Sequence, residues 1–333
     1  MSSNPRITVF IPTFNRLEML KQSVASVLCQ GDFIRLHVLD NASSDGTAEW
    51  LRSIAQNDPR IQLTLRDQNL GSTVNYKDGF NSVQTTYFVP LADDDELAPG
   101  FLEAALRILE SDSSLGAAIF TTQSRSEGQI TGLSPRNAQQ GRREPAAHLL
   151  EWAERGHYVS WSSILWRTEC FRKLSIHSEL DKFGLCSDVW IQFLFFADNP
   201  VFVDSRLGSL FNEHPSQASH KIGPHSIRDL GQMVEAMNWH LFSENRSTES
   251  PKKIFLRSIC IFLNRVIRSR ASKLHVEPAF SEVLSWMWFY MRYFYMYAGF
   301  KEFPLGSCIL NSIVSQKNRR LIKSLCLFLA GLW

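Results

Sequence analysis

Apolar residues in the first 125 positions follow two alternating patterns. Five short runs are rich in branched and aromatic side chains, as buried strands are: residues 7–12, 36–40, 61–65, 87–92 and 116–122. The segments between them carry apolar residues at helical spacing, most clearly Leu17, Leu20, Val24, Val27 and Leu28. This alternation predicts an α/β fold with a mainly parallel sheet and helices on both faces.

Local signals predict where the helices begin. Asn15 is the expected N-cap of the first helix, because Glu18 follows three residues later. Pro99 is the expected first residue of the helix after the fourth strand. Further helices are expected after the turn "SSDGT" and at residues 73–83.

The pattern changes beyond residue 123. Residues 124–145 are polar and contain glycine and proline, which predicts a loop. A second portion with strand and helix signals follows at 146–222, and from about Pro224 the pattern is helical. We therefore expect one domain over 1–222 and a helical C-terminal region over 223–333.

Composition narrows the function classes. The chain has 333 residues, 44% of them apolar, which is ample for a large core. A formal net charge of +2 argues against nucleic acid as the main partner. Six scattered cysteines suggest neither a metal site nor a disulfide framework, so free thiols are expected. The N-terminus has no signal-peptide pattern and no run approaches the ~18 apolar residues of a membrane span, so we expect a cytoplasmic protein.

Polar residues follow three predicted strands at the point where each strand ends. Asn15 and Arg16 follow the first strand, Asp40 ends the second, and residues 93–95 end the fourth. Ligands of such sheets bind at the carboxyl ends of the strands. We therefore expect these side chains to converge on one site.

Four carboxylates, Asp93, Asp94, Asp95 and Glu96, stand in direct succession. Like charges so close together disfavour one another. A hard divalent cation would relieve this repulsion, and Mg²⁺ and Mn²⁺ prefer oxygen ligands of this kind. The alternative is a solvated acidic turn that caps the following helix.

The chain resembles the nucleotide-sugar-binding half of family 2 glycosyltransferases in four blocks of matching order and spacing: "ITVFIPTFNR", "VLDNASSDGTAEWL", "NLGSTVNYKDGF" and "VPLADDDELAPGFLE". The resemblance is strong over residues 5–125 and weak over 155–220. It implies the GT-A fold, with a Rossmann-like nucleotide-binding half. It also implies an inverting, non-processive transfer from a nucleoside diphosphate sugar, with Mg²⁺ or Mn²⁺.

The resemblance implies a set of residues that bind the donor: Pro12, Thr13, Asn15, Arg16, Asp40, Asn75, Lys77 and Asp93. Pro12 and Thr13 would shape the wall beside the base. Asp40 would accept hydrogen bonds from the base edge or the ribose, and Asp93 would lie on the ribose side. Many relatives carry an Ala-Arg-Asn group after the "NLG" loop. Here the helix reads "TVNYKDG", and Asn75 or Lys77 is the expected substitute.

Three residues are implied as metal ligands. Asp94 matches the direct ligand and Asp95 its neighbour, and the metal would bridge the two phosphates of the donor. Many relatives have an aspartate where this chain has Ala92, so the triple aspartate shifts the pattern by one residue. His214, in "FNEHPSQAS", would close on the metal or the diphosphate. The alternative for this histidine is a structural role.

An inverting transfer needs a base that takes the proton of the attacking hydroxyl. Relatives place an acidic residue, often Glu-Asp, at the start of a helix in the second half. Asp188 is the matching acid here, with Ser187 in place of the first residue. The alternative is that Asp188 only caps that helix, and Asp181 is the next candidate base.

The expected organisation follows from these roles. Residues 5–125 would bind the nucleotide sugar, and residues 146–222 would supply the base and the acceptor site. The stretch "SWMWFYMRYFYMYAGF" (285–300) is aromatic and is accompanied by basic residues in the C-terminal region. It is either core or a surface for peripheral contact with the inner face of the cytoplasmic membrane. The expected partners are the donor and a saccharide or lipid-linked acceptor, as in surface polysaccharide or glycolipid synthesis.

Two other functions stay open from the sequence. A sugar nucleotidyltransferase shares the alternating fold and the metal, but no glycine-rich loop with a following Arg and Lys is found after the first strand. A non-catalytic relative would bind sugar nucleotide without turnover, and the presence of Asp40, Asp93 and Asp188 argues against it. A processive synthase is disfavoured because the Gln-x-x-Arg-Trp motif is absent from the sequence.

Overall fold

The computed structural model describes residues 4–135, 139–155, 159–183, 187–215 and 217, with isolated positions at 233, 236 and 237. The chain divides into two compact units, Met1–Trp152 with His157–Lys221, and Ala153–Gly156 with Ile222–Trp333. The sheet and the site described below belong to the first unit. Apart from those three positions, the region 223–333 lies outside the described residues. The predicted helical region and its aromatic stretch are therefore not tested.

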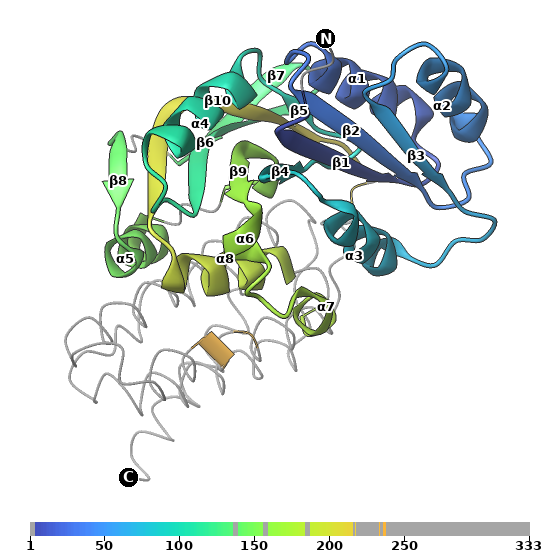
Figure 1. Ribbon diagram of the computed structural model, residues 1–333. Helices are drawn as coiled ribbons and strands as arrows, with labels where there is room; N and C mark the ends of the chain where they lie inside the picture. The colour runs from blue at the N-terminus through green and yellow to red at the C-terminus, as the bar shows by residue number, and fades with distance from the viewer. Residues whose placement is uncertain are drawn as a thin grey trace, which may run out of the picture. The chain divides into compact units, whose positions relative to one another are not determined.

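One mixed sheet forms the centre of the first unit (Figure 1). Its strands lie in the order β3 (Ile61–Leu65), β2 (Ile34–Asp40), β1 (Ile7–Thr13), β4 (Tyr87–Pro90), β9 (Ile164–Arg167), β6 (Ala117–Ser126), β10 (Val201–Glu213) and β5 (Glu96–Leu97). At the edges, β7 (Gln129–Ser134) pairs with β6, and β8 (Gly141–Arg143) pairs with β10. The four strands from β3 to β4 are parallel, whereas β9 is antiparallel to both of its neighbours. The predicted, mainly parallel sheet is thus confirmed.

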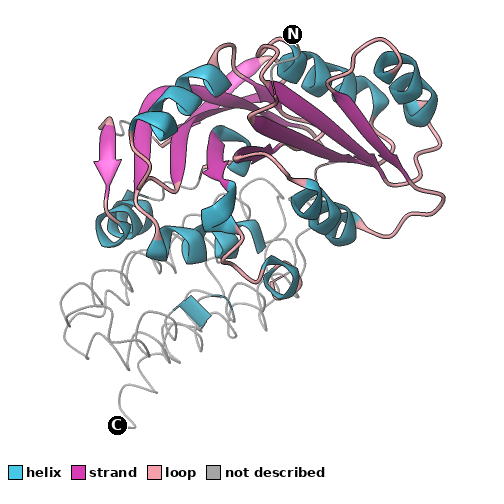
Figure 2. Ribbon diagram, viewed as in Figure 1, coloured by secondary structure: helices cyan, strands magenta, loops and turns pink. Residues whose placement is uncertain are grey.

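Helices cover both faces of this sheet (Figure 2). In Figure 1, α1 (Leu17–Leu28), α2 (Thr47–Ala55) and α4 (Phe101–Ser111) lie on one side. On the other side lie α3 (Ser72–Ser82), α6 (Thr168–Phe171), α7 (Ile176–Glu179) and α8 (Ser187–Asp198). Two further helical segments are α5 (Pro145–Arg155) and the short 3₁₀ turn η1 (Trp161–Ser163).

The two faces of the sheet have different cores, because successive residues of a strand point to opposite sides. Val9 and Ile11 of β1 belong to the cluster that packs against α1, α2 and α4. Phe10, between them, faces the other side and contacts the ring of Phe80 at a centroid distance of 4.9 Å. That second core is aromatic and includes Phe88, Trp166, Phe171, Phe195 and Phe196.

Gly79 lets α3 approach β1 closely. A Cβ atom at this position would lie 2.4 Å from the ring of Phe10. Real Cβ atoms do not come so close to another carbon, so any side chain here would push α3 away from the sheet. The residues on α3 that face the site owe their position to this contact.

The structure confirms the five predicted strands but corrects the predicted N-cap of α1. This helix begins at Leu17, whose backbone N–H donates to Asp45 Oδ2 at 3.0 Å. Asn15 instead accepts a hydrogen bond from the backbone N–H of Ser44 at 2.8 Å. The helix is therefore capped by a loop 28 residues away, which the local sequence signal could not indicate.

Two further local predictions are wrong. Helix α4 begins at Phe101 after Gly100, which adopts a left-handed φ of 74°, so Pro99 lies in the preceding turn. Residues 124–145 are not simply a loop, because β6 continues to Ser126 and β7 and β8 follow. These edge strands are polar because their side chains are largely exposed, and this hides the periodicity of a buried strand.

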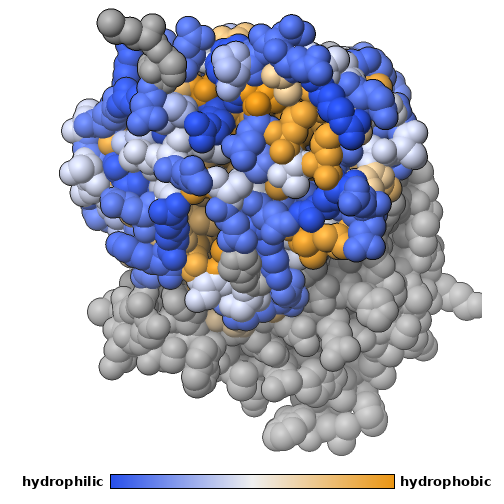
Figure 3. Space-filling model, turned by 45° about the vertical axis from the view of Figure 1, so that its right-hand side comes forward, coloured by the Kyte–Doolittle hydropathy of each residue, from blue (hydrophilic) through white to orange (hydrophobic). Residues whose placement is uncertain are grey.

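The described part of the face drawn in Figure 3 is mainly hydrophilic, with a few apolar areas. The exposed large apolar side chains among the described residues are Phe14, Leu70, Val74, Ile130 and Leu133. No helix in this part of the chain is long and apolar enough to cross a membrane.

Candidate functional site

The predicted polar residues gather at the carboxyl ends of β1, β2 and β4. The loop after β1 and the loop after β2 are fastened to each other by Asn15. Its backbone N–H donates to Ser43 Oγ at 2.8 Å, and its Oδ1 accepts from the N–H of Ser44 at 2.8 Å. Asn15 has a left-handed φ of 53°, which asparagine tolerates better than most residues. Asn15 therefore fixes the relative position of the two loops that border the site.

Asp40 is buried at the end of β2, with 1% of its surface exposed. Ser43 holds it, donating from Oγ to Asp40 Oδ1 at 2.5 Å. The next residue, Asn41, donates to Asn69 Oδ1 at 2.7 Å and accepts from the N–H of Leu70 at 3.0 Å. The loops after β2 and β3 therefore meet beside Asp40, where the base and ribose were expected.

Asn75 and Lys77, the expected substitutes on α3, make other contacts. Asn75 is buried, and its Nδ2 donates to the carbonyl oxygen of Leu39 at 2.8 Å. Lys77 Nζ pairs with Asp181 Oδ2 at 2.5 Å. Asn75 thus supports the end of β2 from the α3 side of the sheet. Lys77 neutralises the charge of Asp181, the alternative candidate for the base.

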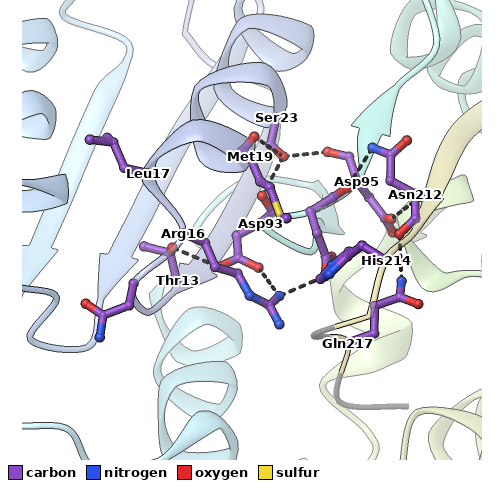
Figure 4. A network of polar contacts seen from close by, with 12 residues as sticks. Thr13, Arg16, Leu17, Met19, Ser23, Asp93, Asp95, Asn212, His214 and Gln217 are labelled. Carbon is purple, nitrogen blue, oxygen red and sulfur yellow. Dashed lines mark hydrogen bonds and ion pairs between the residues drawn. The ribbon is translucent and has the colours of Figure 1, made fainter. Parts of the chain in front are cut away.

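Asp93 and Asp94 share one guanidinium group. Arg16 Nη1 donates to Asp93 Oδ1 and to Asp94 Oδ2, each at 2.8 Å. Thr13 Oγ1 also donates to Asp93 Oδ2 at 2.8 Å. Figure 4 shows the side chains of Thr13 and Arg16 directed toward Asp93. Burial raises the pKa of Asp93, although the charge of Arg16 opposes this rise.

His214 completes this group from the far end of β10. Its Nε2 lies 3.0 Å from Asp94 Oδ2, and both side chains are partly accessible at 14% and 10%. The structure therefore brings together Asp93, Asp94, Arg16 and His214. These residues stand in separate blocks of the sequence, and the sequence analysis predicted that they meet at one site.

Asp95 faces a different direction from Asp94. Its Oδ2 accepts from Ser162 Oγ and its Oδ1 from the backbone N–H of Asn212, each at 3.3 Å. Burial raises the pKa of this carboxyl well above its usual range, and Asp94 adds to the rise. In the structure Asp95 anchors the acidic turn (residues 93–96) to η1 and β10.

Two residues that sequence analysis missed hold the backbone of the acidic turn. Ser23 Oγ on α1 lies 3.0 Å from the carbonyl oxygen of Asp93 and 2.5 Å from that of Asp95, and its one proton is shared between these two acceptors. Asn212 donates from Nδ2 to the carbonyl oxygen of Asp94 at 2.7 Å. The only sequence signal for Asn212 was its place two residues before His214.

Tyr76 is the third residue that the sequence analysis missed. Burial raises the pKa of its phenol well above the ordinary value, and the nearby charges of Asp93, Asp94, Asp95 and Asp188 add to this rise. Asp188 is half-buried in the first turn of α8. The predicted base and the acidic turn therefore lie close enough to act electrostatically on the same hydroxyl group.

The Asp94–His214 pair is the best candidate for metal ligands. The described residues contain no group of three or more His, Cys, Asp or Glu side chains arranged around a metal ion. Asp94 and His214 nevertheless offer one oxygen and one nitrogen atom 3.0 Å apart. Mg²⁺ sites often have only one or two protein ligands, with substrate phosphates and water completing the shell. The residues present fit such a shared site.

Comparison with known proteins gives one family. The profile described as glycosyl transferase family 2 matches residues 8–177, about half of the chain. It covers the acidic turn and most of the sheet, whereas Asp188 and His214 lie beyond it.

Curated relatives match only a segment of the chain. A GalNAc(5)-diNAcBac-PP-undecaprenol beta-1,3-glucosyltransferase of Campylobacter jejuni is 31% identical over 106 residues, 31% of this chain and 34% of that protein. The putative colanic acid biosynthesis glycosyl transferase WcaA of Escherichia coli is 31% identical over 108 residues, 32% of this chain and 38% of that protein. The chain thus spans about a third of the length of these relatives.

Solved structures resemble the chain over most of its length. The S. aureus TarS structure in complex with UDP-GlcNAc has a TM-score of 0.62 at 13% identity, covering 88% of this chain and 81% of that one. The mannosyltransferase PcManGT from Pyrobaculum calidifontis, in complex with GDP-Man and Mn²⁺, has a TM-score of 0.52 at 14% identity, covering 90% and 84%. At these identities the likeness shows a shared fold.

Proposed function

Because the chain belongs to glycosyl transferase family 2, with a GT-A-type fold, we propose that it transfers a sugar from a nucleoside diphosphate sugar to an acceptor hydroxyl. The observation that carries this proposal is the meeting of Asp94 and His214, which are 120 positions apart, at the carboxyl edge of the sheet. Their side chains lie beside Asp93 and Arg16. The charge of Asp188 and the charges of the acidic turn all contribute to the raised pKa of the Tyr76 phenol. This arrangement would combine a site for a metal-held diphosphate with a nearby base.

The nucleoside would lie along the carboxyl ends of β1 and β2. Pro12 and Thr13 end β1, and Asp40 ends β2 beside them, in register with Thr13. Asp93, held by Thr13, would face the ribose. Asn15 would help donor binding indirectly by fixing the loop after β2, since its side chain bonds to the backbone of Ser44. Asn75 would do so by fixing the end of β2, since its side chain bonds to the backbone of Leu39.

Asp94 and His214 would hold Mg²⁺ or Mn²⁺, and the donor diphosphate would supply further oxygen ligands. The bound ion would stabilise the negative charge of the leaving nucleoside diphosphate. Arg16 would contribute a second positive charge beside the same phosphates, since its guanidinium already bridges Asp93 and Asp94. Asp95 would keep the acidic turn in place from within the core.

Asp188 would act as the general base. Its carboxylate would take the proton of the acceptor hydroxyl as that oxygen attacks the anomeric carbon. The bond to the nucleoside diphosphate breaks on the opposite side of the sugar, so the configuration inverts. Asp181 is less suited to this role because Lys77 pairs with it.

The proposed acceptor is a saccharide or a lipid-linked saccharide. The names of the relatives support this, since one refers to an undecaprenol-linked substrate and another to colanic acid biosynthesis. A lipid-linked acceptor would require contact with the inner face of the cytoplasmic membrane. The aromatic stretch at 285–300 is our candidate for that contact, and it lies outside the described residues.

A donor panel tests the proposed function. The protein is mixed with UDP, GDP, CDP and dTDP sugars in the presence of Mn²⁺, and thermal unfolding is followed. A donor at a hundredfold excess over its dissociation constant raises the unfolding free energy by about 2.7 kcal/mol. The products made with the best donor are then identified. Release of nucleoside diphosphate supports sugar transfer, whereas release of pyrophosphate or the absence of any stabilisation contradicts it.

A further inference from the structure

Tyr76 lies on α3 between two residues whose contacts fix its direction. Asn75 points to the carbonyl oxygen of Leu39, and Lys77 points to Asp181. Successive side chains on a helix are about 100° apart, so Tyr76 points between the end of β2 and the segment before α8. Its phenol lies near the acidic turn and Asp188, whose four carboxylates all contribute to raising its pKa.

Ring contacts hold the phenol in this position. The Tyr76 ring lies 4.9 Å from the ring of Trp161 and 6.4 Å from that of Phe10, centroid to centroid. Trp161 begins η1, and the next residue, Ser162, donates to Asp95 Oδ2 at 3.3 Å. The Tyr76–Trp161 ring pair is therefore linked to the acidic turn through Ser162, the residue after Trp161.

The Tyr76 hydroxyl makes no hydrogen bond with any group in the part of the chain that the structure describes. A hydroxyl that is held by packed rings near carboxylates, and that has no partner among the described residues, is poised to bind a polar ligand. A tyrosine phenol is protonated at neutral pH, and the raised pKa of Tyr76 does not change this, so the hydroxyl can donate a hydrogen bond.

We infer that the Tyr76 hydroxyl donates a hydrogen bond to the transferred sugar, and that the Tyr76 and Trp161 rings contact that sugar's apolar surface. This inference rests on the proposed function. The diphosphate would lie over Asp94 and His214, and the acceptor hydroxyl would lie at Asp188. The transferred sugar would lie between these two places, and Tyr76 is the candidate to contact it there because Trp161 and Ser162 link its ring to the acidic turn. Tyr76 thus helps to select the donor sugar, whereas the nucleoside and the phosphates are bound by other residues.

The test compares two ligands for one variant, Tyr76→Phe. Calorimetry with Mn²⁺ measures the dissociation constant of the best sugar nucleotide from the donor panel and of its nucleoside diphosphate alone. We expect Tyr76→Phe to weaken sugar nucleotide binding by about tenfold, the value of one hydrogen bond, and to leave nucleoside diphosphate binding unchanged. The melting temperature should not change, because the hydroxyl has no partner within the described residues.

Tyr87→Phe is the matched control. Tyr87 is buried at the amino end of β4, away from the site, and its hydroxyl accepts from Arg167 Nη1 at 3.4 Å. Both dissociation constants should stay at the wild-type value in this variant. Equal binding of the sugar nucleotide to wild type and Tyr76→Phe would overturn the inference, as would an equal loss for both ligands. If the wild-type protein binds no sugar nucleotide, the proposed function itself is wrong and the inference falls with it.

Discussion

His214 Nε2 lies 3.0 Å from Asp94 Oδ2, although these residues are 120 positions apart in the sequence. The contact joins the last residues after β10 to the turn after β4. Asn212, two residues before His214, reinforces it by donating to the carbonyl oxygen of Asp94. The end of β10 thus meets the turn after β4 at the proposed metal ligand.

Replacing Asp94 should abolish sugar transfer without unfolding the protein. Asp94→Asn removes the charge that would hold the metal, and we expect turnover to fall by at least about a hundredfold. The side chain lies at a strand end and is partly accessible, so the melting temperature should stay near the wild-type value. Activity assays with excess EDTA provide an independent check. Full activity of the variant, or of the wild type in EDTA, would rule out a metal at this position.

Asp188→Asn should separate binding from turnover. A general base acts mainly in the transition state, so we expect kcat to fall by about 10²–10⁴ while donor affinity is retained. Asp181→Asn is the matched control, because this residue pairs with Lys77 at the surface. If Asp181→Asn loses turnover and Asp188→Asn does not, the base is Asp181.

His37 should make the fold sensitive to mild acid. Its ring is buried, with Nδ1 bonded to Ser82 Oγ at 2.8 Å and Nε2 to Thr64 Oγ1 at 2.9 Å. Burial lowers the pKa of His37 to about 4. The unfolded chain therefore binds more protons than the folded chain between about pH 6.5 and 4, and stability falls as the pH drops through this range.

The expected loss for His37 between pH 7 and 5 is on the order of 2 kcal/mol. Urea unfolding at both pH values measures it. The variant His37→Gln should show a smaller loss over the same range than the wild type. An identical loss in the two proteins would assign the acid sensitivity to other groups.

Gly79→Ala should destabilise the fold. The new Cβ would lie 2.4 Å from the Phe10 ring, and overpacking of this kind costs about 1–3 kcal/mol. Gly132→Ala is the control, since its Cβ would meet no atom closer than 3.9 Å. Thermal unfolding of the two variants should differ by several degrees, and equal melting temperatures would show that α3 can shift without cost.

The C-terminal region should bind anionic membranes if its aromatic stretch at 285–300 is a membrane surface. Attraction between basic residues and an anionic surface contributes about 1 kcal/mol per residue and weakens with salt. The full chain should therefore sediment with anionic liposomes at low salt and be released at high salt. A full chain that stays in the supernatant at low salt would assign the aromatic stretch to a core.

The local sequence was enough to predict most of the secondary structure of residues 5–125. Strand β4 is a continuous apolar run, β3 alternates apolar and polar residues, and α1 carries apolar residues at helical spacing, because each element buries one face or both in the core. The edges of the sheet were not predictable in this way. The polar strands β7 and β8 are mostly exposed, so only their pairing with β6 and β10 reveals them.

The blocks of the site could be identified from the sequence, because Asp40 and the triple aspartate stand at strand ends in a fixed order. The sequence could not decide which aspartate faces the ligand, since Asp94 and Asp95 are neighbours with the same chemistry. Only the folded chain turns Asp94 toward His214 and Asp95 toward Ser162. It likewise directs Asn75 and Lys77 to other partners and leaves Tyr76 between them, because a helix sends successive side chains in different directions.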